Sequence, residues 1–478
     1  MASVTSLGIG SGLNVEDIIT SLMKVENRPV ESLQTKAAGI NAKISAFGAL
    51  TSAMSSFQSA AVTLAGIGTW NAMNGSSSNS SAVSATTSTG ASAGNYAVEV
   101  QALATAQSIS SKSYTSATSS VGSGTLKIDI GNWNSDNTTF TANSSNKTLS
   151  VEVTAADTLT TLRDKINALG SGVNASILND ASGARLVINS RDTGTDNGFR
   201  ITTTDGDGTN TDNTGLSALA YDPPNATSAT TLRQSGSNAQ ATINGLPVSS
   251  ASNTLSNVVE GVTLTLGAKT TSAVSVSISA DTDKIKKALT TFTEAYNSLA
   301  TLLSTQTKYD ADSQTAGALQ GDSTAVSLQR QLRNLVGAST PASSVYQTLS
   351  SVGVTLQADG TLAVDNTKFD TALKSNMGEV RKLFTATDLT NSSRSGIGTQ
   401  LRKFSDSVLS VQGALTSRTE SLNQSLSRND TETSKAEARV ADVEKRLRAQ
   451  YAALDTKMSS LTALNTYITN QIEAWNKA

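Results

Sequence analysis

Apolar side chains near the N-terminus recur at spacings of three and four residues, which place them on one face of an α-helix. The apolar positions of this stripe are Leu33, Ala37, Ile40, Ile44, Phe47, Leu50, Met54, Phe57, Ala61 and Leu64. Pro29 lies just before them, where proline favours the first turn of a helix. The spacing predicts one long helix that begins near Pro29 and ends near residue 67, after a shorter helix capped by Asn14 and Asp17.

In the middle of the chain the spacing changes to two residues, which is the period of a half-buried β-strand. Apolar and polar residues alternate at 96–101, 126–130, 149–153, 186–188, 199–201, 262–266 and 274–278. The Asn244-Gly245 pair follows a strand signal at Ile243 and predicts the tight turn of a hairpin. These patterns predict antiparallel strands with one buried face.

One predicted helix interrupts the strands, and Asp157 is its expected N-cap. Its apolar face consists of Leu159, Leu162, Ile166 and Leu169. Before the strands, residues 75–95 are rich in Gly, Ser, Thr and Asn, which predicts a linker or a set of loose loops.

Helical spacing returns at Asp281 and continues over most of the remaining chain. The apolar faces lie within residues 285–303, 328–335, 369–384 and 401–422, the last of them running through Val411. Between two of these helices, Asp359-Gly360 separates two short apolar pairs and predicts a hairpin.

The clearest repeat is a heptad at the C-terminus. One seam position is occupied by Leu447, Leu454, Leu461, Ile468 and Trp475, and the other by Tyr451, Met458, Asn465 and Ile472. Two core positions in seven residues are typical of a coiled coil. A helix over 440–475, which contains no Gly or Pro, would be about 54 Å long. Asn465 either sets the register of this seam or faces solvent, and the sequence leaves both open.

A coiled-coil helix needs a partner, and the nearest candidate is the N-terminal helix. The sequence therefore predicts an α+β multidomain fold in which the terminal helices pair and the β-rich middle is inserted between them. The seam either serves only within the chain or also contacts other proteins.

The composition excludes several classes of function. Only 15% of the residues are charged, 4% are aromatic, and the net charge of −2 comes without a basic stripe, so nucleic acid is not an expected partner. The chain has no Cys and no His, which excludes Ser-His-Asp and Cys-His catalysis and His-ligated zinc. The remaining Asp and Glu pairs are scattered, so we expect neither an enzyme nor a cofactor.

The acidic run at 205–212 resembles a calcium loop only superficially. Asn210 stands where such a loop has Gly, and Leu216 stands where it has its bidentate Glu. We therefore favour a polar surface turn over a calcium site.

The N-terminus carries no Lys or Arg before Lys24 and lacks the pattern of a cleaved signal peptide. No window has the roughly 18 apolar residues of a membrane span. If the protein leaves the cell, it uses another route. Gly8, Gly10 and Gly12 disfavour a stable isolated helix, so we expect the first thirty residues to order on docking, although Ile18 and its neighbours could be ordinary core.

Several short blocks resemble the flagellar filament cap proteins, the hook-associated protein 2 family, over nearly the whole chain. Ser-Leu-Gly-Ile-Gly-Ser-Gly-Leu-Asn-Val at 6–15 is similar to the opening signature of that family, and Glu-Asn-Arg-Pro-Val at 26–30 to its following Pro break. Ile-Asn-Gly at 243–245, with Ser-Asn-Thr at 252–254 and Glu-Gly-Val-Thr-Leu at 260–264, resembles its second block. Residues 157–189 resemble a motif shared by flagellins and hook-associated proteins.

The resemblance implies four domains. A terminal coiled-coil domain would comprise 1–42 and 440–478, and a helical domain 43–74 and 281–439. A β-rich domain would comprise 75–115 and 231–280, and an outer β-rich domain 116–230.

The resemblance also implies partners. Members form a ring of copies, usually five, at the distal tip of the flagellum outside the cell, where they fold and place exported flagellin. They leave through the flagellar type III exporter after a cytoplasmic chaperone has held the C-terminal helix. The hook–filament junction protein is a further partner, and some members adhere to mucin or host surfaces.

The residues expected at the partner or subunit interface lie on the terminal helices. They are Leu13, Ile18, Ile19, Leu22, Leu33, Ile40, Ile44, Phe47, Leu447, Tyr451, Leu454, Met458, Leu461, Asn465, Ile468, Ile472 and Trp475. The alternatives are another axial flagellar protein, such as flagellin or a junction protein, and a secreted adhesin. An adhesin or phage fibre would show internal β repeats, and the sequence has no fixed-period repeat.

Overall fold

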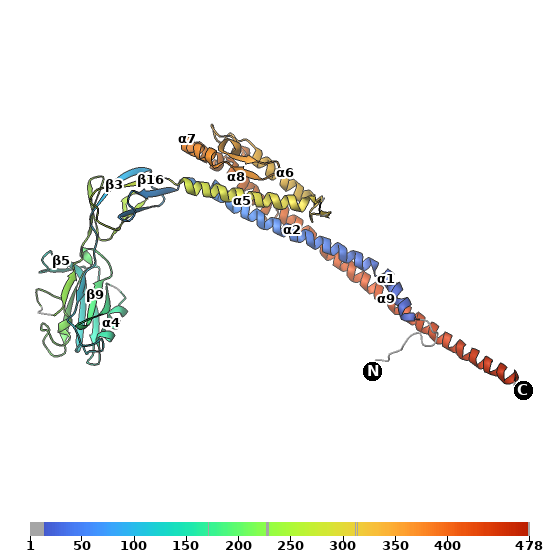
Figure 1. The fold of residues 1–478 in the computed structure, drawn as a ribbon, viewed down its shortest axis with the longest axis horizontal. Coiled ribbons are helices and arrows are strands. Elements are labelled where there is room, and N and C mark those ends of the chain that lie inside the picture. The colour runs from blue at the N-terminus through green and yellow to red at the C-terminus, as the bar shows by residue number, and fades with distance from the viewer. Residues whose placement is uncertain (1–13, 171, 226–228, 311, 313, 477–478) are drawn as a thin grey trace. The chain divides into compact units, whose positions relative to one another are not determined.

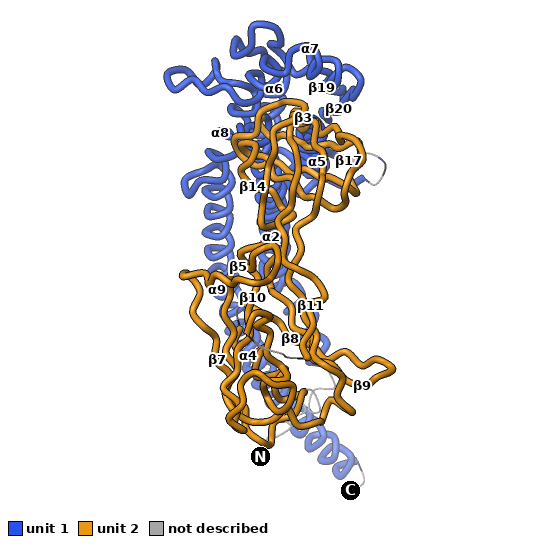
Figure 2. Tube along the Cα trace, turned by 90° about the vertical axis from the view of Figure 1, so that its left-hand side faces the viewer, with its two compact units in different colours: residues 1–70, 282–478 blue, residues 71–281 orange. Residues whose placement is uncertain are grey.

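The computed structural model describes residues 14–170, 172–225, 229–310, 312 and 314–476 of the chain. The chain forms two compact units (Figure 2). The first combines the residues up to 70 with those from 282 onward, and the second comprises residues 71–281. Leu13, one of the predicted interface residues, lies outside the described residues.

Helices make up most of the first unit (Figure 1). They are α1 (Val15–Glu26), α2 (Arg28–Ala65), α3 (Ile67–Trp70), α5 (Thr282–Thr307), α6 (Ser323–Gly337), α7 (Asn366–Thr385), α8 (Ile397–Leu409) and α9 (Ala414–Asn476). Two hairpins accompany them, β17 (Tyr309–Asp310) with β18 (Thr315–Ala316), and β19 (Val354–Leu356) with β20 (Leu362–Val364). The short 3₁₀ turns of this unit are η3 (Leu349–Val352) and η4 (Ser392–Arg394).

The core of this unit is an apolar cluster in which α2 packs against α5, α8 and α9. Its centre is aromatic: the ring of Phe57 lies 5.5 Å from that of Phe292 and 6.0 Å from that of Tyr296. At the end of α3, Trp70 stacks on Phe384 at 5.4 Å. The long helix predicted from Pro29 onward is confirmed as α2, and the part of its stripe from Phe47 to Leu64 is buried in this cluster.

Local signals set most of the helix ends. The Asn14 cap is confirmed, since its side chain accepts a hydrogen bond from the backbone N–H of Asp17. The single helix predicted across residues 401–422 is wrong, because α8 ends at Leu409 and α9 begins at Ala414. A Cβ on Gly413 would lie 2.2 Å from the carbonyl oxygen of Val408, so the chain folds back on itself there. Val411, at this break, is 85% exposed.

The second unit consists of antiparallel sheets. A five-stranded sheet has the order β1 (Met73–Ser77), β16 (Val274–Ala280), β3 (Gly94–Ala102), β12 (Ala239–Ile243) and β13 (Leu246–Ser250). It shares an apolar cluster with the sheet of β14 (Thr254–Val259), β15 (Val262–Leu266) and β2 (Val83–Thr87).

A separate apolar cluster lies between two further sheets and one helix. One sheet contains β10 (Gly198–Asp205), β5 (Gly124–Trp133), β6 (Phe140–Ala142) and β7 (Leu149–Val153). The other has the order β11 (Thr231–Gln234), β4 (Ser108–Ser110), β9 (Gly183–Ser190) and β8 (Val173–Asp180). The helix is α4 (Leu159–Ala168), and the 3₁₀ turns η1 (Thr195–Asn197) and η2 (Ser217–Leu219) precede and follow β10. The predicted α+β fold, with terminal helices in contact and antiparallel sheets in the middle of the chain, is confirmed.

The predicted linker at 75–95 is wrong, because it contains most of β1 and all of β2. β1 pairs with β16, and β2 pairs with β15. Hydrogen bonding to residues 262–280 therefore makes strands of a stretch whose composition favours loops. Gly75 permits close packing here, since a Cβ at this position would lie 2.9 Å from Ala85.

Both predicted hairpin turns are confirmed. Asn244-Gly245 joins β12 to β13 with φ angles of 52° and 82°, the left-handed pair that a type I′ turn requires. Asp359-Gly360 lies between β19 and β20.

The cap of α4 differs from the expectation. Thr158 is the N-cap, and its hydroxyl accepts from the N–H of Thr161 in a reciprocal capping box. Asp157 instead accepts hydrogen bonds from the N–H of Thr154 at 2.7 Å and from Lys165 Nζ at 2.6 Å. These bonds, that from Lys165 foremost, lower the pKa of the Asp157 carboxyl. The carboxylate thus ties α4 to the turn before it.

Candidate assembly surface on the terminal helices

The first contact between the two ends of the chain is a small apolar cluster. Val15, Ile19 and Met23 of α1 are buried against α9. Their partners on α9 are Val440, Val443, Leu447 and Tyr451. The structure therefore brings Ile19 together with Leu447 and Tyr451, as the heptad and the N-terminal stripe suggested.

The face of α1 differs slightly from the predicted one. Ile18 is half-buried and Leu22 is 40% exposed, whereas Val15 and Met23 are buried. The sequence spacing could have identified Val15 and Met23, because both lie four residues from Ile19 and so share its side of the helix. We expected this segment to order on docking, with ordinary core as the alternative, and in the structure Val15, Ile19 and Met23 form a small core with α9 of the same chain.

The predicted residues of α2 lie at different depths. Leu33, Ile40 and Ile44 are half-buried, and Ile40 and Ile44 touch the helical core. Phe47 is fully buried within that core. It is placed to stabilise the helical unit and has no exposed surface to offer a partner.

An ion-pair cluster joins α1 to α9 beside the apolar contact. Arg448 donates two hydrogen bonds to the Glu16 carboxylate, at 2.9 and 2.8 Å, and a third to Glu444 at 2.9 Å. The hydrogen bond from Arg448 lowers the pKa of Glu16, and the two carboxylates raise the pKa of Arg448. These side chains are well exposed, so solvent screens the pair and it orients α1 more than it stabilises it.

The seam between α2 and α9 contains a buried asparagine that the sequence patterns did not predict. Asn429 is 2% exposed, and its Nδ2 donates to the carbonyl oxygen of Leu33 at 3.0 Å. Its position in the sequence could have indicated this burial, because Asn429 lies seven residues after Leu422 and fourteen after Leu415, as a seam residue of a heptad does. Asn465, the asparagine considered for a register role, is exposed in the single chain.

A groove runs beside the α1–α9 contact and has a volume of about 550 Å³. Ile19, Met23 and Val440 contribute apolar surface to it, and Lys24 and Glu437 are among the charged residues at its rim. All of its lining residues belong to the helical unit, on α1, the start of α2 and α9.

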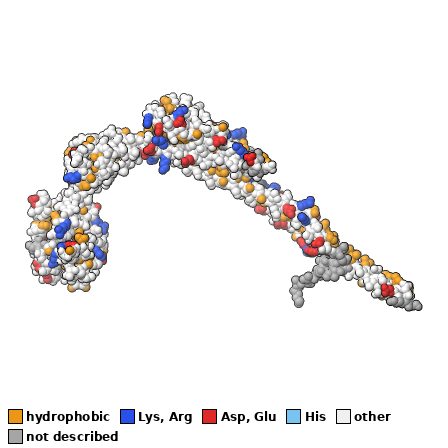
Figure 3. Space-filling model, viewed as in Figure 1, with side chains coloured by type: hydrophobic (Ala, Val, Ile, Leu, Met, Phe, Trp, Pro, Cys, Tyr) orange, Lys and Arg blue, Asp and Glu red, His pale blue; other side chains and the backbone are white. Residues whose placement is uncertain are grey.

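Beyond Tyr451, the apolar seam residues of α9 have no partner among the described residues. The exposed fraction of each residue is 43% for Leu454, 37% for Met458, 59% for Leu461, 46% for Ile468, 51% for Ile472 and 82% for Trp475. Leu464 and Tyr467 widen this stripe, and no charged residue occurs between Lys457 and Glu473. Figure 3 shows the hydrophobic side chains along the end of the helix. We call Leu454–Trp475 the apolar face of α9.

An apolar face of this size is unusual on a water-exposed surface and is typical of a protein–protein contact. None of the helices in the described part of the chain carries an apolar run that could cross a membrane. An apolar face on one side of a helix can dock into a groove or bundle of other helices.

The second unit offers a polar surface. A cavity of about 540 Å³ is lined by neutral residues of β5, β6 and the loops next to them, including Asn132, Asn134 and Thr141, with Asp196 as its acidic residue. Asp196 accepts a hydrogen bond from Asn132 Nδ2 at 2.9 Å.

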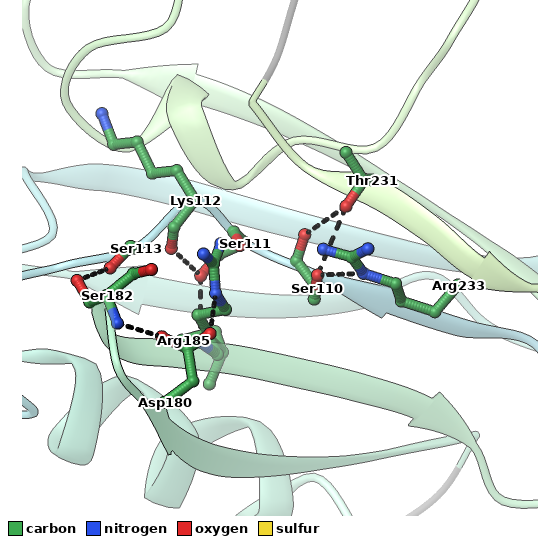
Figure 4. Close-up of polar contacts among 10 residues, drawn as sticks. Ser110, Ser111, Lys112, Ser113, Asp180, Ser182, Arg185, Thr231 and Arg233 are labelled. Carbon is green, nitrogen blue, oxygen red and sulfur yellow. Dashed lines mark hydrogen bonds and ion pairs between the residues drawn. The ribbon is translucent and has the colours of Figure 1, made fainter.

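A basic cluster on the β11–β4–β9 sheet is structural (Figure 4). Arg185 pairs with Asp180 at 2.7 Å and donates to the carbonyl oxygen of Ser111. Arg233 donates to the hydroxyl of Ser110 at 2.7 Å, so these cations tie strand ends together. Among the described residues, no group of three or more acidic side chains converges to hold a metal ion.

The 205–212 run forms the predicted polar turns. The Asp205 carboxylate accepts from the N–H of Ser217 at 2.6 Å, and Asp207 accepts from the N–H of Thr209 at 2.8 Å. The carboxylates satisfy the backbone of their own loop.

Comparison with known proteins identifies relatives of the full chain. The family model for the N-terminus of flagellar hook-associated protein 2 matches residues 11–107, and that for its C-terminus matches 236–463. The flagellin hook IN motif matches 139–192, which includes the 157–189 stretch.

Curated relatives match over nearly their whole length. The chain is 31% identical to flagellar hook-associated protein 2 of Escherichia coli strain K12, over 99% of both chains. It is 30% identical to that of Salmonella typhimurium, over 100% of both. The crystal structure of the flagellar cap protein FliD D1-D2-D3 domains from Escherichia coli aligns with a TM-score of 0.61 at 30% identity, covering 79% of this chain and 99% of that one.

Proposed function

The chain belongs to the flagellar hook-associated protein 2 family, the flagellar cap proteins, and we propose that its copies form a ring that promotes folding and polymerisation of exported flagellin. Proteins of this family are structural and are not enzymes. The cap lies outside the cell at the tip of the flagellar filament.

The apolar face of α9 is the observation that supports this proposal. A monomer that exposes eight large apolar side chains on one helix needs further copies or other helical proteins to cover them. Contacts between unlike surfaces of identical copies close into a ring when the rotation allows it, and five copies is our proposed number.

We further propose that the apolar face has successive partners. A cytoplasmic export chaperone would cover it before export, and the hook–filament junction protein and flagellin would contact it afterwards. One helix face can serve these partners in turn, because each would bury the same apolar positions in the groove or bundle it provides.

The proposed division of labour follows the four predicted domains. The terminal helices at 1–42 and 440–478 would make the axial contacts, and residues 43–74 with 281–439 would support them. The β-rich parts, 75–115 with 231–280 and 116–230, would form the outer surface of the cap.

Charge placed on the apolar face tests the proposal. Leu461→Asp with Ile468→Asp should reduce filament number at least tenfold, because two carboxylates would be desolvated at the contact. The matched control is Ala463→Asp with Asn470→Asp, which adds the same charge on the other side of the helix. Filaments counted by electron microscopy distinguish the pairs, and equal loss in both would mean that charge alone, and not this face, is responsible.

We also propose a secondary role in adhesion to mucin or host surfaces, carried by the second unit. The cavity beside Asn132 is lined by amides and hydroxyls, which suit the hydroxyl groups of a glycan. Thr141→Phe would fill this cavity, so mucin binding should fall severalfold while filaments stay normal. The exposed Thr204→Phe serves as the control, and unchanged mucin binding in Thr141→Phe would exclude this cavity.

A further inference from the structure

Burial along α9 ends at Asn429. Leu415 and Leu422 enter the helical core, and no described residue of α9 beyond Asn429 is buried. On α2, no residue between Val30 and Ala46 is buried. The two helices therefore leave the core as a mostly exposed pair, with α1 packed at its outer end. Ile40 and Ile44 still pack against the core, so we call residues 15–39 together with 423–476 the terminal arm.

Asn429 lies at the base of the terminal arm, where the heptad spacing calls for an apolar residue. Its Nδ2 has a partner in the carbonyl oxygen of Leu33, but its buried Oδ1 accepts no hydrogen bond from the described residues. A buried amide that is only partly paired costs free energy, and a leucine at the same place would instead gain it. Asn429 therefore lowers the stability of the pair where it joins the core.

The rest of the arm adds little to offset this cost. The following positions on the same side of α9 are Thr433 and Ala436, which are only half-buried and short. Farther out, the contact consists of the small α1 cluster and the exposed Glu16–Arg448 pair. The strongest apolar residues of α9 come only after the part that α1 and α2 cover.

Between its start and Asn429, α9 is anchored to the helical core by an ion pair. Asp322 is 2% exposed in its side chain, and its Oδ2 accepts from Arg418 Nε at 3.0 Å and Nη2 at 2.8 Å. The same carboxylate caps α6 through the N–H groups of Thr324 and Ala325. Breaking this pair would leave the buried Asp322 carboxylate without its cation, which is costly, so α9 stays attached to the core up to this point.

We propose that Asn429 is a positioning residue that lets the terminal arm open and close while the helical core stays folded. Opening separates α1 and the first part of α2 from α9. It adds Val440, Val443 and Leu447 to the apolar face, so a partner helix gains a longer surface than the closed chain presents. Asn429 sets how often this happens, because its amide lowers the free energy of local opening below that of global unfolding.

Hydrogen exchange of the full-length protein, followed by mass spectrometry, tests this proposal. Peptides covering 28–39 and 425–450 should exchange by local opening, at rates nearly independent of low denaturant, while peptides covering 46–64 and 285–303 exchange much more slowly. Asn429→Leu should slow exchange of the arm peptides about tenfold or more and leave the core peptides unchanged. Asp430→Leu adds the same side chain at the exposed neighbouring position and should leave the arm unchanged.

Asn429→Ala removes the amide without adding volume, so it keeps the test valid if leucine is too large for the seam. It too should slow exchange of the arm. The proposal is wrong if arm and core peptides exchange at the same rate in the natural chain. It is also wrong if both Asn429 variants leave arm exchange unchanged or faster.

Discussion

A chain that lacks residues 461–478 should remain folded but support few or no filaments, with flagellin accumulating as monomer in the medium. The deletion removes Leu461, Ile468, Ile472 and Trp475, which are the outer part of the apolar face. All described residues in the deleted stretch are exposed, so no buried contact of the single chain is lost. The effect should therefore fall on assembly and not on stability, with filament number reduced at least tenfold.

Adding the purified protein to cells separates capping from export. Purified full-length chain, supplied from outside to cells without their own copy, should restore filaments, and the purified deletion variant should not. Thermal unfolding of the two proteins should coincide, because the α1 contact ends at Tyr451. Filaments of normal number with the purified variant would show that the apolar face is dispensable, and the proposed capping contact would then be wrong.

Phe57→Ala should destabilise the helical unit by about 3–5 kcal/mol, the cost of removing a fully buried aromatic ring. Phe57 contacts both Phe292 and Tyr296, so its loss leaves a cavity between α2 and α5. Ser56→Ala is the neighbouring control, since this exposed hydroxyl donates only to the carbonyl oxygen of Ser52 and should change stability by less than about 0.5 kcal/mol.

The three tryptophans allow the two units to be measured separately. Trp70 reports on the helical core, because its Nε1 donates to the carbonyl oxygen of Leu64 at 2.7 Å and its ring stacks on Phe384. Trp133 belongs to the second unit, and Trp475 is 82% exposed at the end of α9. In a protein that carries Trp133→Phe and Trp475→Phe, urea unfolding followed by Trp70 fluorescence gives the free energy of unfolding that Phe57→Ala removes. A loss below about 1 kcal/mol would mean that this aromatic contact is not central to the core.

Several features were determined by the sequence alone. The three-and-four spacing after Pro29 predicted α2, and the alternation in residues 96–278 predicted strands, because local periodicity decides which face of an element can be buried. Asn244-Gly245 predicted its turn because few residues adopt a positive φ at low cost. The spacing patterns together predicted the α+β fold, and the blocks at 6–15 and 243–264 indicated the family and with it the cap function.

Tertiary structure decided which residues these faces meet. β1 and β2 are ordered by β16 and β15, so composition at 75–95 suggested a linker where long-range pairing makes strands. Burial also distinguished Asn429 from Asn465, although both occupy heptad positions, because only Asn429 lies where α2 covers α9. The spacing of apolar residues determines which face of a helix or strand is apolar. Which partner buries that face is decided only when distant parts of the chain come into contact.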